Sequence, residues 1–371
     1  MKSFSARSRY PSIFVFAATC TICAITFPLA AQINPAIMPS AGPLAKQSVS
    51  RLLLTDVVRA DKRLVAVGDR GYIVYSDNDG QDWARAKAPA NLPLLNGVYF
   101  SDANTVWAVG HDSVILKSTD QGREWVQVHA AAKDARALMD IVFTDANTGF
   151  AVGAYGAFYE TTDAGKTWAS RKIIAPVKAA VAVKPVAKAV RGERGAGKAQ
   201  NSADDDEKSA DEDRHLNAII RLKGQHLFIA GEAGTLMSSM DNGKTWARLT
   251  SPYKGSFFGA LAAKDGAVII FGLRGNVFRS ADPGLKSWKP IPTHTKASIM
   301  GAAKLTDGAI ALAGLAGTVL LSKDDGKTFA PLASGTTKPL AAPVAGAANE
   351  LLVVGESGAR NVPLTATVAK K

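Results

Sequence analysis

Short apolar runs that end in glycine recur seven times along the chain. An apolar run of this length, bounded by glycine, predicts a buried β-strand. In six of the seven, a second glycine follows three residues after the first, and this spacing predicts a tight turn into the next strand. Ser113 takes the place of that glycine in the second run. The runs cover residues 64–68, 106–110, 150–153, 228–231, 268–272, 310–314 and 351–355.

A polar pattern, Ser/Thr-x-Asp-x-Gly-x-x-Trp, follows six of these turns. Three copies depart from it, because Asn78 replaces the Asp, Phe329 replaces the Trp, and residues 280–288 contain one extra position. The glycines of the pattern are separated by 42, 43, 78, 41 and 42 residues. A period near 40 residues indicates a repeat architecture. The six copies lie at residues 76–83, 118–125, 161–168, 239–246, 280–288 and 322–329.

The same pattern predicts a hairpin turn with a structural role. Ser, Thr and Asp side chains bond nearby backbone N–H groups, and glycine supplies a positive φ angle. The aromatic residue then begins the outgoing strand and packs between repeats. We assign this structural role, rather than a catalytic one, to Asp120, Gly122, Trp125, Asp163, Gly165, Trp168, Asp241, Gly243, Trp246, Asp324 and Gly326.

Each repeat contains four short strands, since a further apolar strand, such as 97–100 or 140–143, precedes each glycine-ended run. Seven such units predict an all-β, seven-bladed β-propeller of four-stranded antiparallel blades over residues 51–371. The seventh unit is too short for an outer strand. We therefore expect the N-terminal segment 32–50 to add that strand and close the ring, since raw sheet edges are avoided. Its prolines are tolerable on an edge strand.

A charged insertion accounts for the long gap between the third and fourth patterns. Residues 178–198 hold six basic residues and one acidic residue, whereas residues 204–214 hold seven acidic residues and two basic ones. Such a composition cannot bury a core and predicts disorder over 174–213, between blades three and four. The insertion is either a tolerated surface loop, or a tether or lid over a binding face.

The first 31 residues have the composition of a secretory signal peptide. A basic start precedes the apolar run 13–29, and Ala30 and Ala31 offer a small-residue cleavage site. Cleavage would leave an exported, periplasmic protein, and an uncleaved N-terminal anchor is the alternative. Removal of three basic residues lowers the net charge from +12 to +9, which favours anionic partners or membrane surfaces. Both cysteines lie in this segment, so the remainder holds no disulfide or cysteine metal site.

The combination of glycine-bounded strands, Asp-box turns and the pattern Phe-x-Asp-x-Asn-x-Gly-Phe that begins at the end of a first strand, as at 143–150, resembles the photosystem II stability/assembly factor family of BNR/Asp-box propellers, including relatives in non-photosynthetic bacteria. The resemblance covers about residues 50–360, interrupted by the insertion. It implies a non-enzymatic scaffold that binds membrane-protein subunits during assembly. In relatives outside photosynthetic organisms it implies an exported accessory protein associated with efflux-type transporters.

Asp boxes also occur in sialidases, which makes a carbohydrate-active propeller the alternative function. The Arg-Ile-Pro signature of sialidases is absent, and Arg70, Arg274, Tyr155 and Glu232 do not supply the three arginines that such a site needs. The five histidines lack metal-binding spacing, so no metal or cofactor is expected.

We expect binding, if any, at the turns that follow the second strand of each blade, because these positions vary on a repeated frame. The candidates are Arg70, His111, Asp112, Tyr155, Glu232, Arg274 and Glu356. The expected partner is a protein, such as a membrane-protein or transporter component, rather than nucleic acid, and the chain is expected to be a monomer.

Overall fold

The computed structural model describes residues 42–44, 49–131, 135–173 and 214–365. All of these belong to one compact unit, residues 40–371. The signal segment 1–31 and the insertion 174–213 lie outside the described residues, so both remain expectations. Within the described ranges, no helix is long and apolar enough to cross a membrane.

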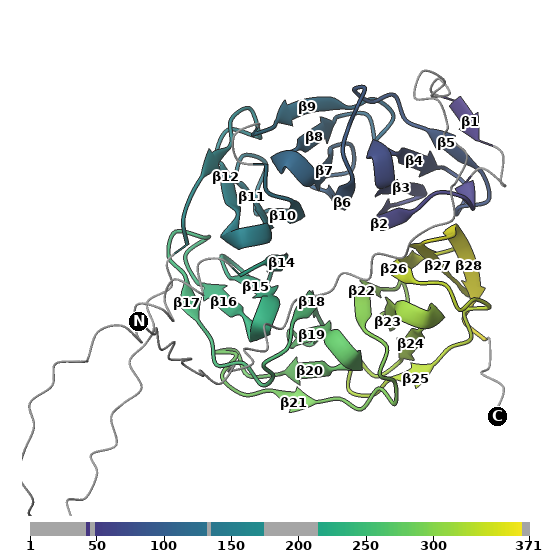
Figure 1. Ribbon diagram of the computed structural model, residues 1–371. Helices are drawn as coiled ribbons and strands as arrows, with labels where there is room; N and C mark the ends of the chain where they lie inside the picture. The colour runs from purple at the N-terminus through teal and green to yellow at the C-terminus, as the bar shows by residue number, and fades with distance from the viewer. Residues whose placement is uncertain (1–41, 45–48, 132–134, 174–213, 366–371) are drawn as a thin grey trace, which may run out of the picture. The chain divides into compact units, whose positions relative to one another are not determined.

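The predicted seven-bladed β-propeller is confirmed (Figure 1). Six blades contain four consecutive antiparallel strands, and the seventh contains three within the described residues. The blades are β2 (Leu54–Ala60), β3 (Arg63–Gly68), β4 (Ile73–Ser76) and β5 (Trp83–Arg85); β6 (Leu95–Phe100), β7 (Val106–Gly110), β8 (Ile115–Ser118) and β9 (Val126–His129); β10 (Leu138–Phe143), β11 (Gly149–Gly153), β12 (Phe158–Thr161) and β13 (Ala169–Ser170); β14 (Leu216–Arg221), β15 (Leu227–Gly231), β16 (Leu236–Ser239) and β17 (Ala247–Arg248); β18 (Phe257–Ala262), β19 (Val268–Gly272), β20 (Val277–Ser280) and β21 (Lys289–Pro290); β22 (Ile299–Lys304), β23 (Ile310–Gly314), β24 (Val319–Ser322) and β25 (Ala330–Pro331); β26 (Leu340–Ala345), β27 (Glu350–Gly355) and β28 (Gly358–Pro363).

The first strand of each blade lies against the first strand of the next, and β26 of blade seven lies against β2 of blade one, so the ring is closed. The second strands of blades one to six are fully buried, as the apolar glycine-ended runs predict, and β27 of blade seven is buried except at Glu350. Each first strand carries a β-bulge near its start, as between Leu54 and Asp56 in β2. A bulge bends the strand and aims a side chain out of the regular ladder.

The N-terminal segment differs from expectation. Its described strand β1 (Gly42–Leu44) pairs with β5 on the outer edge of blade one, with Leu44 opposite Trp83. The expectation that this segment supplies the outer strand of blade seven is therefore wrong for residues 42–44, while 32–41 and 45–48 lie outside the described residues. The ring closes instead by packing, because Trp83 and Leu54 share a buried cluster with Leu352 and Val354 of blade seven.

The Asp-box pattern forms the predicted hairpin turns. In blade two, the Ser118 hydroxyl accepts the Gly122 N–H at 2.9 Å, and Asp120 Oδ1 accepts the Ser118 hydroxyl at 2.7 Å and the Glu124 N–H at 3.0 Å. The Trp125 indole N–H donates to the Gly122 carbonyl at 2.9 Å. These bonds occupy the polar groups of the motif within the turn itself. The corresponding Ser/Thr–Gly bonds recur at Thr161–Gly165, Ser239–Gly243 and Ser322–Gly326.

The variant boxes behave differently from one another. Asn78 keeps the standard geometry, since its side-chain oxygen accepts the Ser76 hydroxyl and the Asp82 N–H. In blade five, Asp282 bonds the N–H groups of Gly284 and Lys286 instead, and the buried Ser280 hydroxyl has no hydrogen-bond partner within the described chain. The extra residue therefore weakens this turn.

Candidate functional site

The candidate site is built from six single turns of 3-10 helix that join the second and third strands of blades one to six. Because they make the same connection in every blade, they lie on one face of the ring, which we call the turn face. They are η1 (Asp69–Gly71), η2 (His111–Ser113), η3 (Ala154–Gly156), η4 (Glu232–Gly234), η5 (Leu273–Gly275) and η6 (Leu315–Gly317).

In each turn, the middle residue is exposed to solvent. The middle residue has a left-handed backbone, with φ of 52° at Arg70 and at Tyr155 and 59° at Arg274. The residue that follows is also left-handed; it is glycine in five of the six turns and Ser113 in η2, and a Cβ on Gly71 would come within 2.2 Å of the Leu92 side chain. A left-handed conformation is uncommon for a bulky residue and carries a free-energy cost. Strained positions of this kind cluster at ligand-binding sites.

The predicted binding residues all lie in these turns or in the corresponding β27–β28 turn. Arg70, Asp112, Tyr155 and Arg274 occupy the left-handed position, and their side chains are exposed. Blades four and six have Ala233 and Ala316 there. The remaining candidates, His111, Glu232 and Glu356, flank the left-handed position or its counterpart.

The structure brings only two of the candidates together. His215, at the entrance to blade four, stacks edge-on against Tyr155 with ring centroids 4.9 Å apart. Its backbone N–H donates to Glu232 Oε2 at 3.2 Å. Arg136 completes this cluster, because its guanidinium donates to the Tyr155 carbonyl at 3.0 Å. Tyr155 is 59 % exposed and is therefore a large aromatic surface held by polar neighbours. His111 and Asp112 are neighbours in η2, whereas Arg70, Arg274 and Glu356 belong to separate blades, and within the described residues no hydrogen bond or ion pair joins one of these candidates to another.

The segments that lead into the first strands add positive charge to the turn face. These segments border the turns directly, since a Cβ on Gly275 would come within 2.3 Å of the Thr295 carbonyl and one on Gly317 within 1.9 Å of the Thr336 carbonyl. Within the described residues, these segments and the turns carry eight basic residues, Arg51, Arg70, Arg136, Arg214, Lys254, Arg274, Lys296 and Lys338, against four acidic ones, Asp69, Asp112, Glu232 and Glu356. Two of these acids are neutralised locally, because Asp69 lies 3.7 Å from Arg70 and Glu356 2.8 Å from Lys338. The turn face is therefore net basic.

The sequence interpretation missed the basic residues of these leading segments. Their positions before each first strand have no shared residue type, so the repeat period alone does not single them out. Alignment of every blade on its glycine-ended run would have placed them beside the turns.

Two carboxyl groups on first strands were also missed. Asp56 Oδ1 accepts the Val57 N–H at 2.8 Å and Oδ2 accepts the Val98 N–H of blade two at 2.9 Å. Asp140 makes the corresponding bonds to Ile141 and to Ile219 of blade four. Burial raises the pKa of each carboxyl to about 7, although the backbone N–H bonds act in the opposite direction. Each carboxyl therefore links the first strand of its own blade to the first strand of the next blade by a hydrogen bond.

The residues that follow the charged insertion, Arg214 and His215, lie at the turn face. The Gly156 N–H of η3 donates to the Arg214 carbonyl at 3.0 Å, and the Glu232 N–H of η4 donates to the His215 carbonyl at 2.8 Å. This agrees with the expectation that the insertion connects a fourth strand to a first strand on the face that carries the turns.

Among the described residues, no three His, Cys, Asp or Glu side chains are grouped so that they could hold a metal ion. The surface hollows of the described chain include two at the outer rim, with volumes of about 440 and 460 Å³. Neither is lined by a predicted binding residue.

Comparison with protein families supports the resemblance deduced from the sequence. The model of the family described as "Photosynthesis system II assembly factor YCF48" matches residues 121–195, which include the Asp box of blade three. No curated protein matches the chain in sequence.

Many solved structures share the fold. A YCF48 bound to D1 peptide is 17 % identical, with a TM-score of 0.62, and the match covers 90 % of this chain and 98 % of that one. YCF48 from Cyanidioschyzon merolae is 15 % identical, with a TM-score of 0.62 and coverage of 88 % and 98 %. A GH74 enzyme from Niastella koreensis is 14 % identical, with a TM-score of 0.58 and coverage of 89 % and 55 %. Identities this low establish a common fold and leave the activity open.

Proposed function

We propose that this propeller is an exported, non-enzymatic scaffold that binds an acidic, extended segment of a partner protein on its turn face. The partner would be a subunit of a membrane complex or transporter, which the scaffold supports during assembly. The basic character of the turn face carries this proposal. The exposed side chains of Arg70, Tyr155 and Arg274, each on a left-handed backbone, add to it, because arginine and tyrosine are enriched in protein recognition surfaces.

The similarity to an assembly factor bound to a peptide supports a protein ligand for this fold. A rigid ring with a charged face suits such a role, because complementary charge accelerates encounter and selects among partners. The proposed export rests on the composition of residues 1–31. The proposed monomeric state rests on a ring that is already closed by its own blades.

The test is charge reversal on one face with a matched control on the other. Arg70→Glu combined with Arg274→Glu should at least halve the partner recovered with a tagged protein after mild crosslinking and membrane solubilisation. Lys166→Glu combined with Lys244→Glu reverses two exposed lysines in the Asp boxes, on the opposite face, and should leave recovery unchanged. Equal recovery with both double variants, or no recovered protein with the unaltered chain, would refute the proposal.

A carbohydrate-active propeller is the second candidate, favoured by the fold shared with a GH74 enzyme and by the proximity of Tyr155, His215 and Glu232. Retaining glycosidases hold two catalytic carboxyl groups about 5 Å apart. Hydrolysis of a sialoside or glucan that is lost in Glu232→Gln would establish this candidate, and no turnover is expected.

A further inference from the structure

Six of the seven seams between blades hold an aromatic side chain from an Asp box. In each case it packs on the second or third strand of the preceding blade. Trp168 lies edge-on to Trp107 at 6.0 Å, and Trp246 lies edge-on to Phe158 at 5.8 Å. Since an aromatic residue buries 150–250 Å², these side chains dominate the seams. The six are Trp83, Trp125, Trp168, Trp246, Trp288 and Phe329.

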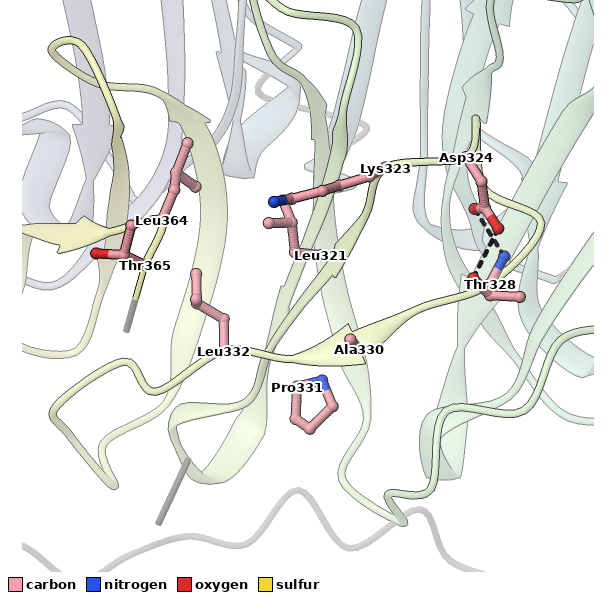
Figure 2. A pocket seen from close by; sticks show the side chains of 9 residues that line it. All are labelled: Leu321, Lys323, Asp324, Thr328, Ala330, Pro331, Leu332, Leu364 and Thr365. Carbon is pink, nitrogen blue, oxygen red and sulfur yellow. Dashed lines mark hydrogen bonds between the residues drawn. The ribbon is translucent and has the colours of Figure 1, made fainter. Parts of the chain in front are cut away.

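The seam between blades six and seven differs. The buried cluster that fills it contains only aliphatic residues within the described chain. A hollow of about 440 Å³ opens at its outer side, and Figure 2 shows Leu321 and Leu332 of blade six on one wall and Leu364 on the other. Ala330 and Pro331 of β25 complete the apolar lining, and Lys323, Asp324, Thr328 and Thr365 line the remainder. The hollow therefore occupies the place where the other six seams hold an aromatic ring.

The edge strand of blade seven offers backbone groups beside this hollow. In blades one and six, Tyr75 and Leu321 of the third strand pair with Ala84 and Ala330 of the fourth. Val362 takes the corresponding place in β28, four residues after the glycine that opens the strand, yet β28 pairs only with β27 in the described chain. An unpaired edge is a template for another strand.

Two side chains of β28 fit an added strand rather than an Asp box. Pro363 stands where the other six blades have the Ser or Thr that begins the box, so the hydroxyl that organises this turn is missing. The side-chain oxygen of Asn361 is buried and has no hydrogen-bond partner among the described residues. A buried polar atom without a partner is costly, and an incoming strand could supply the donor.

We propose that the seam between blades six and seven binds an extended segment of a partner protein, which adds a fourth strand to β28 and inserts an aromatic side chain into the hollow. Backbone hydrogen bonds supply affinity in such strand addition, and the side-chain pocket supplies selectivity. This surface lies at the rim, so the inference does not depend on the turn face.

The sequence of the chain favours a separate partner over its own N-terminal segment. Residues 32–41 contain no aromatic residue and include Pro35 and Pro39, each of which lacks the N–H that strand pairing needs. The strand that follows them, β1, is already paired with blade one. These features favour an aromatic-bearing strand from another protein as the occupant over residues 32–41 of this chain.

A peptide copied from the chain's own repeat tests this inference. The probe is a fluorescently labelled peptide of residues 239–250, which contains the Asp box and outer strand of blade four. Anisotropy titration of the full chain should show saturable binding, and replacement of the peptide's Trp246 by Ala should weaken it at least tenfold. Loss of affinity on this replacement would show that the aromatic side chain takes part in binding, and the variants of the protein then locate the site.

Variants of the protein locate the site. Ala330→Trp fills the hollow from an exposed position and should abolish binding, whereas Ala169→Trp, at the corresponding position of blade three, should preserve it. Absence of binding, equal effects of the two variants, or binding only after deletion of residues 1–41 would overturn the inference. The last result would mean that the chain's own N-terminal segment covers the edge. None of these outcomes bears on charge reversal at the turn face.

Discussion

Asp120 shows how a single carboxylate organises a turn. It accepts the Ser118 hydroxyl and the N–H groups of Arg123 and Glu124, all within 3.0 Å. Burial alone would raise its pKa, but these bonds stabilise the charged form and lower it. The same balance lowers the pKa of Asp241 to about 2. The role of the motif is therefore mechanical, and the sequence pattern contains everything needed to deduce it.

Removal of this carboxylate should destabilise the fold, whereas its conversion to an amide should not. Asp120→Ala leaves three donors without their acceptor and should lower the free energy of unfolding by about 1–3 kcal/mol. Asp120→Asn should cost under about 1 kcal/mol, because Asn78 fills the same role in blade one. Urea unfolding measures both, and equal losses would contradict the explanation.

The carboxyls of Asp56 and Asp140 predict a stability that falls as the pH rises. Their pKa is raised to about 7 from 3.8, so the folded chain binds more protons than the unfolded chain between about pH 4 and pH 7. The free energy of unfolding should therefore fall through this window, by at most about 1.4 kcal/mol per pH unit for each group. The Asp-box carboxylates, with lowered pKa values, act in the opposite sense only below about pH 4.

The double variant Asp56→Asn/Asp140→Asn isolates this effect. It should be less stable than the unaltered chain at pH 5, because one oxygen on each side chain no longer accepts an N–H. Its stability should be nearly constant between pH 5 and pH 8. Thermal unfolding of both proteins between pH 5 and pH 8 tests this. If stability depended on pH as steeply in the variant as in the unaltered chain, these two carboxyls would be excluded as the origin of the pH dependence.

At the scale of the element, the left-handed backbone of the middle turn residue lowers the free energy of unfolding slightly. Ala316 adopts φ 55° in η6 without any polar side chain to gain from exposure. Ala316→Gly should therefore raise the free energy of unfolding by about 0.5–1 kcal/mol. Ala311→Gly, in the fully buried strand β23, should lower it. Differential scanning calorimetry of the two variants checks this, and destabilisation by both would rule out strain at the turn.

The elements were predictable because their signals are local. Apolar runs, glycine pairs and Asp boxes gave the strands, the turns and the number of blades. The place of β1 was not predictable, since both blade one and blade seven offer an outer edge and three residues carry no preference between them. The bulge carboxyls were missed because each bonds a strand about 40 or 80 residues away, which no local pattern encodes.

At the scale of the whole molecule, packing between blades one and seven holds the ring together. Trp83 is 5 % exposed in this seam, and Trp83→Ala should cost about 3–5 kcal/mol. Trp288 of blade five is only partly buried, and its indole N–H has no partner in the described chain, so Trp288→Ala should cost less. Urea midpoints compare the two, and an equal or reversed order would show that this seam does not limit stability.

The proposed binding surface lies on the turn face, whereas the Asp boxes lie on the opposite face of the ring. The turn candidates were predictable from their variation on a repeated frame, whereas the surrounding basic residues became visible only when neighbouring blades were placed side by side. Site-specific photocrosslinking in cells that make the protein tests the central claim most directly. A photoreactive residue at position 274 should capture a membrane protein, and one at position 166 should capture none. Capture from position 166 alone, or from neither position, would contradict a partner-binding turn face.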